Sequence, residues 1–289
     1  MKILTEAQRS SYLDRGYCAG HDWISGEWLD RLNQVTNAFV EESREVERSG
    51  AKFDLEPGHT RANPRLRRLN SPIDFHETYW EFASSGPFVD IAEDLLGANV
   101  KFHHSKLNFK WSGGGEAVKW HQDIQFWPHT NYDVLTIGVY LSDVTEDMAP
   151  MGIIPKSHAQ DLFDLYDHDG QWTGHIKDED LRRLDIDSAE YLSGPAGTVT
   201  VHNCRAVHGS PPNQSAAPRP LLLCAYSAAD AIPITNLTAG GKHAETIVRG
   251  EKTKWARFDP RPVPMPPDWS KQGYKSIFQH QQGESLDET

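Results

Sequence analysis

Apolar and polar positions alternate with two different periods along the chain, and the period changes near residue 98. In the first 97 residues, apolar side chains recur every three or four positions, which is the spacing of one buried helix face. We expect a helix between its cap Thr5 and Gly16, a second at 27–48 and a third at 87–96. The polar stretch of about 50–75 predicts a loop.

After residue 98 the pattern changes: ANVKFHHSKLNFKW alternates polar and apolar residues as a half-buried strand does, and further short β segments follow it. Glycine or proline separates these runs, and no helical pattern lies between them. Several short strands without intervening helices favour an antiparallel barrel or jelly roll over a parallel sheet. The expected strands carry the sequences ANVKFHHSKLNFKW, AVKWHQD, DVLTIGVYLSDV, PMGIIPKSH, AGTVTVHNCRAVHGS and RPLLLCAYSAAD.

Together these patterns predict a mainly β fold with flanking α-helices and a double-stranded β-helix core of the jelly-roll or cupin-like kind. We expect a single domain over 1–289, whose residues 1–97 are mainly helical and whose residues 98–230 form the core. The core is expected to contain an irregular acidic insertion at about 160–193. A C-terminal extension at 231–289 follows it, and its tail from about 258 is proline-rich, so that it cannot continue a central strand.

Composition then narrows the range of functions. The 289 residues include 38% hydrophobic and 10% aromatic side chains, which is enough for a sizeable core and argues against disorder. A formal net charge of −12 disfavours a nucleic-acid partner, which requires a basic surface. Since no apolar run approaches the length of a membrane span, we expect no membrane partner either. A small molecule is the expected ligand.

The cysteines and arginines change this picture little. Cys18, Cys204 and Cys224 are widely spaced and form no C-x-x-C pair, which disfavours structural zinc and suits a reducing, cytoplasmic location. Four arginines between 61 and 68 are able to bind an anion, but a solvated loop balanced by nearby acids is the simpler interpretation.

The residues that carry chemistry are two histidines and a carboxylate. His121 and Asp123 lie two apart on an expected strand, so their side chains point to the same face. His208 ends a later expected strand, and His202 is an alternative partner. Two histidines and one carboxylate form the facial triad of non-haem Fe(II) oxygenases, which leaves coordination positions open for co-substrate and O2.

Arg219 supports this interpretation, because H-x-D alone is common by chance. The residue follows His208 onto the next expected strand and directly precedes the apolar run 221–225. A guanidinium forms a planar, bidentate clamp for a carboxylate, which the far end of 2-oxoglutarate requires. A surface ion pair is the common alternative for an arginine, but the apolar run favours burial beside an anion.

On these motifs the chain resembles the phytanoyl-CoA dioxygenase superfamily, which includes the ectoine hydroxylases. The resemblance covers most of the chain and is carried by LTEAQ…RGY, LNFKW…WHQDIQFW, LSDVTEDMAPMGIIPKSH and HGSPPNQSAAPRPLLLCAYSAAD. It implies that His121, Asp123 and His208 bind Fe(II). His208 is preferred to His202 because Arg219 follows it at the family spacing.

The resemblance also implies which residues contact 2-oxoglutarate. Arg219 and Ser210 match residues that bind the 5-carboxylate of 2-oxoglutarate, and Asn108 matches an asparagine that contacts it. Trp127 matches an aromatic beside the co-substrate in ectoine hydroxylases, with ordinary core packing as the alternative. The candidates for substrate contact are Gln122, His104, Phe126, His129 and Arg67.

The chain departs from the family pattern in two places. DMAPMGIIPKSH stands where ENGPL…IPGSH is usual, with Met148 and Ala149 in place of Asn-Gly and Lys156 in place of Gly. The ectoine-hydroxylase signature ends after Trp127, so ectoine is not the expected substrate. Asp123 stands where related halogenases have Gly or Ala, which favours hydroxylation. The acidic chain has no obvious phosphate site, which disfavours a CoA thioester.

We therefore predict an Fe(II)- and 2-oxoglutarate-dependent dioxygenase that uses O2 to hydroxylate an unactivated C–H bond of a small molecule. The products are succinate, CO2 and the hydroxylated amino acid or natural product. A Zn- or Mn-dependent hydrolase with the same ligands is an alternative, and it would not need Arg219. A non-catalytic ligand-binding protein on the same barrel is another, although an intact triad argues against it.

Overall fold

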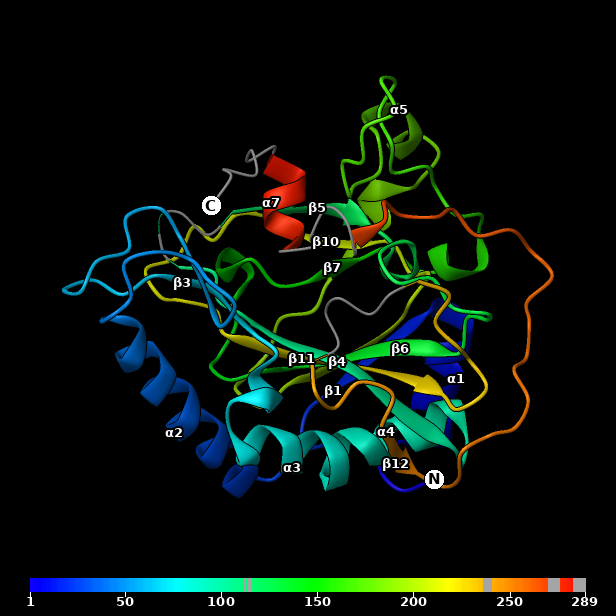
Figure 1. The fold of residues 1–289 in the computed structure, drawn as a ribbon, viewed down its shortest axis with the longest axis horizontal. Coiled ribbons are helices and arrows are strands. Elements are labelled where there is room, and N and C mark those ends of the chain that lie inside the picture. The colour runs from blue at the N-terminus through cyan, green and yellow to red at the C-terminus, as the bar shows by residue number, and fades with distance from the viewer. Residues whose placement is uncertain (112, 114–115, 236–240, 270–275, 283–289) are drawn as a thin grey trace.

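Two antiparallel sheets face each other at the centre of the molecule (Figure 1). The computed structural model describes the chain except residues 112, 114–115, 236–240, 270–275 and 283–289. In spatial order, the larger sheet contains β1 (Tyr17–Gly20), β9 (Val199–Asn203), β6 (Val134–Tyr140), β11 (Leu221–Ala228), β4 (Val100–Asn108), β3 (Leu66–Asn70) and β2 (Phe53–Leu55), with β12 (Ile247–Arg249) also paired to β4. The smaller sheet contains β5 (Val118–His121), β10 (His208–Ser210), β7 (Gly152–Ile153) and β8 (Glu190–Tyr191). The predicted fold class is confirmed.

Helices cover the outer face of the larger sheet, and a short one packs beside β5 (Figure 1). The α-helices are α1 (Glu6–Arg15), α2 (Gly26–Ser43), α3 (Glu77–Ser85), α4 (Pro87–Leu96), α5 (Asp178–Leu181) and α7 (Ile277–Gln282). Single 3-10 turns lie at Pro72–Asp74, Asp123–Gln125, Glu146–Met148, Ser157–Ala159 and Ile186–Ser188. No helix in the described part of the chain combines the length and apolar character needed to cross a membrane.

The helix ends follow the local sequence signals. Thr5 and Gln8 form a reciprocal capping box at the start of α1, and Gly16 ends it with a left-handed φ of 86°.

The expected loop at about 50–75 is wrong, because β2 and β3 lie within it. These strands are three and five residues long, and β3 contains two arginines, so neither has a clear apolar alternation. The helix α3 was not predicted either.

Alternation along the larger sheet separates a helix-facing side from an inner side. Phe102 and Leu107 of β4 pack into the apolar cluster with Phe88 of α4. The register shifts between Ala225 and Tyr226 of β11, so that His103 is the extra residue of a β-bulge. Residues from His104 onward then alternate toward the smaller sheet.

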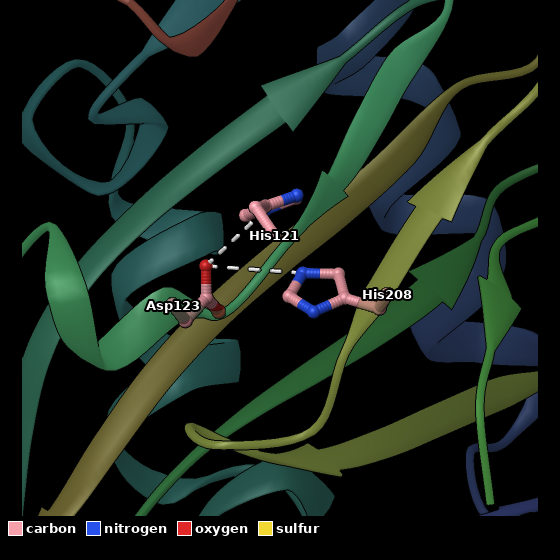
Figure 2. Close-up of side chains that lie close together, drawn as sticks. All are labelled: His121, Asp123 and His208. Atoms are coloured by element: carbon pink, nitrogen blue, oxygen red, sulfur yellow. Dashed lines mark ion pairs between the residues drawn. The ribbon is translucent and has the colours of Figure 1, made fainter. Parts of the chain in front are cut away.

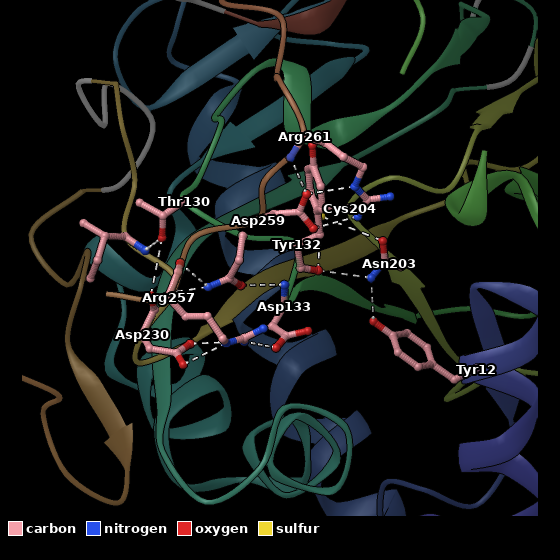
Figure 3. A network of polar contacts seen from close by, with 12 residues as sticks. Tyr12, Thr130, Tyr132, Asp133, Asn203, Cys204, Asp230, Arg257, Asp259 and Arg261 are labelled. Atoms are coloured by element: carbon pink, nitrogen blue, oxygen red, sulfur yellow. Dashed lines mark hydrogen bonds and ion pairs between the residues drawn. The ribbon is translucent and has the colours of Figure 1, made fainter. Parts of the chain in front are cut away.

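The segment after β12 returns to the end of β11, where ion pairs and backbone contacts hold it (Figure 3). Arg257 pairs with Asp230 (Nε–Oδ2 3.1 Å) and with Asp133. The amide of Asp259 donates to the carbonyl of Thr130 at 2.7 Å. Because Arg257 is half-exposed, each ion pair contributes little alone, and the segment depends on the combined contacts.

Tyr226 joins the larger sheet to its helical layer. Its buried hydroxyl donates to the carbonyl of Ala83 in α3 at 2.7 Å. Four residues beyond Ala83 the chain has Pro87, which has no N–H to satisfy that carbonyl. We predict that Tyr226→Phe lowers the free energy of unfolding by about 1–3 kcal/mol, because it leaves a buried carbonyl unpaired.

Urea denaturation followed by circular dichroism measures this change. Tyr191→Phe is the control, since Tyr191 is exposed. An unchanged midpoint for Tyr226→Phe would contradict the proposed link between sheet and helix.

Candidate metal centre and co-substrate site

His121, Asp123 and His208 converge at the inner face of the smaller sheet (Figure 2). His121 ends β5 and His208 begins β10, and the two residues are register partners on these neighbouring strands. Asp123 follows β5 by two positions and starts a 3-10 turn. One ligand atom from each residue lies within 4.8 Å of the others, and all three residues are buried.

The two imidazoles are oriented through their Nδ1 atoms. Nδ1 of His121 lies 2.8 Å from the carbonyl of Lys119, and Nδ1 of His208 lies 3.0 Å from that of Ala206. Each carbonyl accepts the Nδ1 proton and leaves the Nε2 lone pair free for a metal. The Nε2 atoms lie 3.7 and 3.8 Å from Oδ1 of Asp123. Burial lowers the pKa of His121 to about 4 and that of His208 well below its usual range, so both rings are neutral.

Asp123 is held from the opposite sheet. The hydroxyl of Thr136 on β6 donates to Oδ2 at 3.0 Å, and Nε2 of His202 on β9 lies 3.3 Å from the same oxygen. Burial alone would raise the pKa of Asp123, but Lys106 and the imidazoles of His208 and His202 lower it well below its usual range. The carboxylate is therefore ionised, with Oδ1 facing the two histidines.

His202, the alternative histidine, has a different position. It contacts the far oxygen of Asp123, and its ring packs against that of His208 at 4.3 Å between centroids. The cluster that the described residues form with metal-ligand spacing contains His208 and not His202. Two neutral imidazoles and one carboxylate are the donor set that suits Fe(II) with open positions. The residues present therefore fit an iron ion.

A buried arginine lies farther along the interior. Arg219 is 3% exposed and lies beside Tyr140 and Lys110, and in the described part of the chain no carboxylate pairs with it. Its Nε has no hydrogen-bond partner. An unpaired buried guanidinium is costly, so this site calls for an anion. The distal carboxylate of 2-oxoglutarate has the charge and planar shape that fit it.

Two further candidates lie close to these residues. Asn108 is the register partner of Leu221, two positions after Arg219, and the Ser210 carbonyl accepts from Nζ of Lys110 at 3.3 Å. Nε of Arg68 donates to Oδ1 of Asn108 at 3.0 Å, which directs the amide NH2 of Asn108 away from Arg68 as a donor. Ser210 lies two residues after His208 on β10, so its side chain points to the same face, and it is partly exposed. Both positions agree with a role beside the co-substrate.

A wall of imidazole and indole rings lies next to the metal centre. His103, His104 and His129 surround Trp127, with ring centroids 5.1, 5.6 and 5.9 Å from the indole. The β-bulge at His103 brings two successive histidines into this wall. Nε2 of His103 and of His129 is buried without a hydrogen-bond partner among the described residues. Phe126 packs edge-on to His121 at 5.7 Å on another side.

Two expected substrate residues are engaged elsewhere. Gln122 is fully buried, and its amide donates to the Arg205 carbonyl at 2.8 Å and accepts from the Phe163 amide at 3.0 Å. Since both ends bind backbone groups, Gln122 cross-links two loops and does not face the metal. Arg67 is paired with Asp54 and Glu116. The adjacent Arg68, not Arg67, shares the inner face with Asn108.

Three interior residues were not predicted from the sequence, and a fourth, Arg68, was considered only as one of four arginines in a solvated loop. Lys106, Lys110, Arg68 and Thr136 all carry polar groups on inner positions of central strands or just beyond them. Lys106 and Lys110 share the parity of Asn108 in KLNFKW, so strand alternation was a signal that was present. Thr136 lies in an apolar run, and only the three-dimensional structure brings it to Asp123.

A double-stranded β-helix with two histidines and one carboxylate on its inner face defines the class of non-haem metal oxygenases. The family model "Phytanoyl-CoA dioxygenase (PhyH)" matches residues 12–221, and the chain belongs to this family. The predicted enzyme class, an iron- and 2-oxoglutarate-dependent dioxygenase, is thereby confirmed.

Known relatives agree with this class. The chain is 33% identical to the probable alpha-ketoglutarate-dependent hypophosphite dioxygenase of Stutzerimonas stutzeri, over 95% of this chain and 96% of that protein. It is 31% identical over 180 residues to the L-proline trans-4-hydroxylase of Streptomyces griseoviridis, covering 56% of this chain and 67% of the relative. Crystalline EctD from S. alaskensis with bound Fe shares the fold, with a TM-score of 0.71 at 21% identity over 87% of this chain and 88% of EctD.

The hydroxyl of Thr136 donates to Oδ2 of Asp123, and this contact fixes the direction in which Oδ1 points toward the two histidines. We predict that Thr136→Val weakens Fe(II) binding about 10- to 100-fold, the usual effect of losing a group that orients a metal ligand. Competition with a chelator under anaerobic conditions measures the affinity. Thr200→Val is the matched control, since the buried Thr200 hydroxyl has no partner among the described residues. Equal affinities in the two variants would contradict this role.

Proposed function

We propose that His121, Asp123 and His208 hold Fe(II) and that Arg219 holds 2-oxoglutarate in an oxygenase that hydroxylates its substrate. The observation that carries the proposal is the buried guanidinium of Arg219, which has no carboxylate partner within the described chain. A hydrolase that uses the same three ligands has no need of such a group. The pairing of an open triad with an anion clamp favours the oxygenase.

The three ligand residues are prepared for a metal. The Lys119 and Ala206 carbonyls fix both imidazoles with Nε2 toward the metal position, and burial keeps the rings neutral. Asp123 offers Oδ1 while its other oxygen stays bound to the larger sheet. When bound, Fe(II) with 2-oxoglutarate supplies the oxidising power of O2, with release of succinate and CO2.

The interior residues would hold 2-oxoglutarate. Arg219 would pair with its 5-carboxylate, and the hydroxyl of Ser210 would be a second donor to that group. Asn108 would donate its amide N–H to the co-substrate, since Arg68 fixes the amide orientation.

The enzyme acts on a small molecule, and the wall of Trp127, His103, His104 and His129 is the surface we assign to substrate. We therefore assign Trp127 to substrate rather than to co-substrate, because it packs among these imidazoles.

The relatives are named for hypophosphite and L-proline, which are both small and polar. Hypophosphite is the first substrate to test. A cytoplasmic location agrees with three buried cysteines that form no disulfide.

Arg219→Met tests the clamp. We predict that it raises the 2-oxoglutarate concentration needed for half-maximal succinate formation by roughly 10- to 100-fold, because a charge-assisted hydrogen-bond pair is lost. Arg219→Lys keeps the charge without the planar fork and should fall between the wild type and Arg219→Met. Asp123→Ala gives the baseline without succinate. An unchanged requirement for 2-oxoglutarate in Arg219→Met would overturn the assignment.

A further inference from the structure

A lysine ammonium faces the metal centre from the opposite sheet. Lys106 lies on β4 between His104 and Asn108, and strand alternation turns these three side chains to the same inner face. Its charge acts on both Asp123 and His121 across the interior. The residue therefore belongs to the surroundings of the metal, on the side of the larger sheet.

Lys106 has no counter-ion of its own. Within the described part of the chain it forms no hydrogen bond or ion pair, and the charged groups that act on it are Asp123 and Arg68. Asp123 is committed to the metal, and Arg68 is a second cation. Burial lowers the pKa of Lys106, and Asp123 opposes that change. An ammonium kept in such a place is costly unless a ligand brings negative charge.

Lys106 is also accessible, although it lies in the middle of a sheet. Strands β11 and β3 are hydrogen-bonded to the two sides of β4, yet the side chain of Lys106 remains partly exposed. Its accessible surface therefore lies inside the barrel, where a small ligand can reach it. Two other lysines near β4 differ, because Lys101 pairs with Glu245 and Lys110 donates to backbone carbonyls.

The charges in the interior do not balance without a further anion. Iron(II), ionised Asp123 and doubly charged 2-oxoglutarate together leave one negative charge, which Arg219 neutralises. The charges of Lys106 and Arg68 remain, and Arg68 forms no ion pair with any described residue. Lys110 lies within the influence of Glu56 and Glu116. A bound monoanion near Lys106 would neutralise one of these two charges.

From these positions we infer that the substrate is a compact oxoanion. Lys106 binds its non-reacting oxygens, and Arg68 is a second cation close to Lys106. The inference rests on the proposed function and names the substrate class of that site. His104 precedes Lys106 on the same face, and burial lowers its pKa to about 3, so its neutral ring supplies an N–H donor rather than a second full charge. The site thus favours an anion over a neutral ring or a zwitterion.

The competing use of Lys106 is to hold the carboxylate of 2-oxoglutarate nearest the metal. Both uses place negative charge beside the same ammonium, so activity alone does not separate them. Binding measurements on each ligand do separate them, because the substrate use affects one affinity and the co-substrate use affects the other.

The test is anaerobic titration calorimetry of the Fe(II)- and 2-oxoglutarate-loaded enzyme with hypophosphite as the anion probe. We expect saturable binding by the wild type and roughly 10- to 100-fold weaker binding by Lys106→Met, because a charge-assisted hydrogen bond is lost. Lys156→Met is the matched control, since its ammonium is exposed. The affinity for 2-oxoglutarate should be unchanged in Lys106→Met.

Thermal unfolding of the metal-free proteins checks that Lys106→Met folds. Because Lys106 has no counter-ion, its replacement by an apolar residue should not lower the unfolding temperature. Failure of hypophosphite to bind the wild type, or equal binding by Lys106→Met, would overturn the inference. Loss of 2-oxoglutarate affinity in Lys106→Met would assign Lys106 to the co-substrate instead. Failure of wild-type enzyme to bind 2-oxoglutarate would contradict the proposed function itself.

Discussion

The carboxylate of Asp123 joins the two sheets, and the rest of the site depends on this contact. One oxygen accepts hydrogen bonds from Thr136 and His202 of the larger sheet. The other oxygen faces the imidazoles of His121 and His208 on the smaller sheet. Because each oxygen has its own set of partners, the distance between the sheets and the direction of the metal ligands are fixed by one group.

The interior around this carboxylate is positive, although the chain as a whole carries a formal net charge of −12. Arg219, Lys106 and Arg68 point inward and have no carboxylate partner among the described residues. Arg65 and Arg67, which lie close to Arg68 in the chain, are paired with acids. Inward-facing cations without a counter-ion reduce the stability of the empty protein. Their energetic cost is recovered when anionic ligands bind, so the barrel is built to hold negative charge.

Local sequence rules predict those parts of the site that depend on neighbours in the chain. His121 and Asp123 are two residues apart, and the structure brings them together with His208, although Asp123 lies in the 3-10 turn after β5 and not on the expected strand. The capping box of α1 is likewise local, and its predicted ends are confirmed. The family resemblance correctly indicated the enzyme class.

Features that depend on pairing between distant strands were not predictable from the sequence. Which of Arg67 and Arg68 faces inward is decided by the pairing of β3 with β4, and that pairing reverses the expected choice. The bulge at His103 depends on the register between β4 and β11. Gln122 lies between two metal ligands, but its partners Arg205 and Phe163 are far away in the sequence. In each case a long-range contact determined the outcome.

We propose above all that iron and 2-oxoglutarate meet at the site formed by the triad and Arg219. Anaerobic titration of the Fe(II)-loaded protein with 2-oxoglutarate, followed by visible absorption, tests this most directly. We predict a weak metal-to-ligand charge-transfer band that saturates with 2-oxoglutarate and is lost in Asp123→Ala. Absence of the band in wild-type protein that demonstrably contains iron would contradict the account and favour a hydrolase or a binding protein.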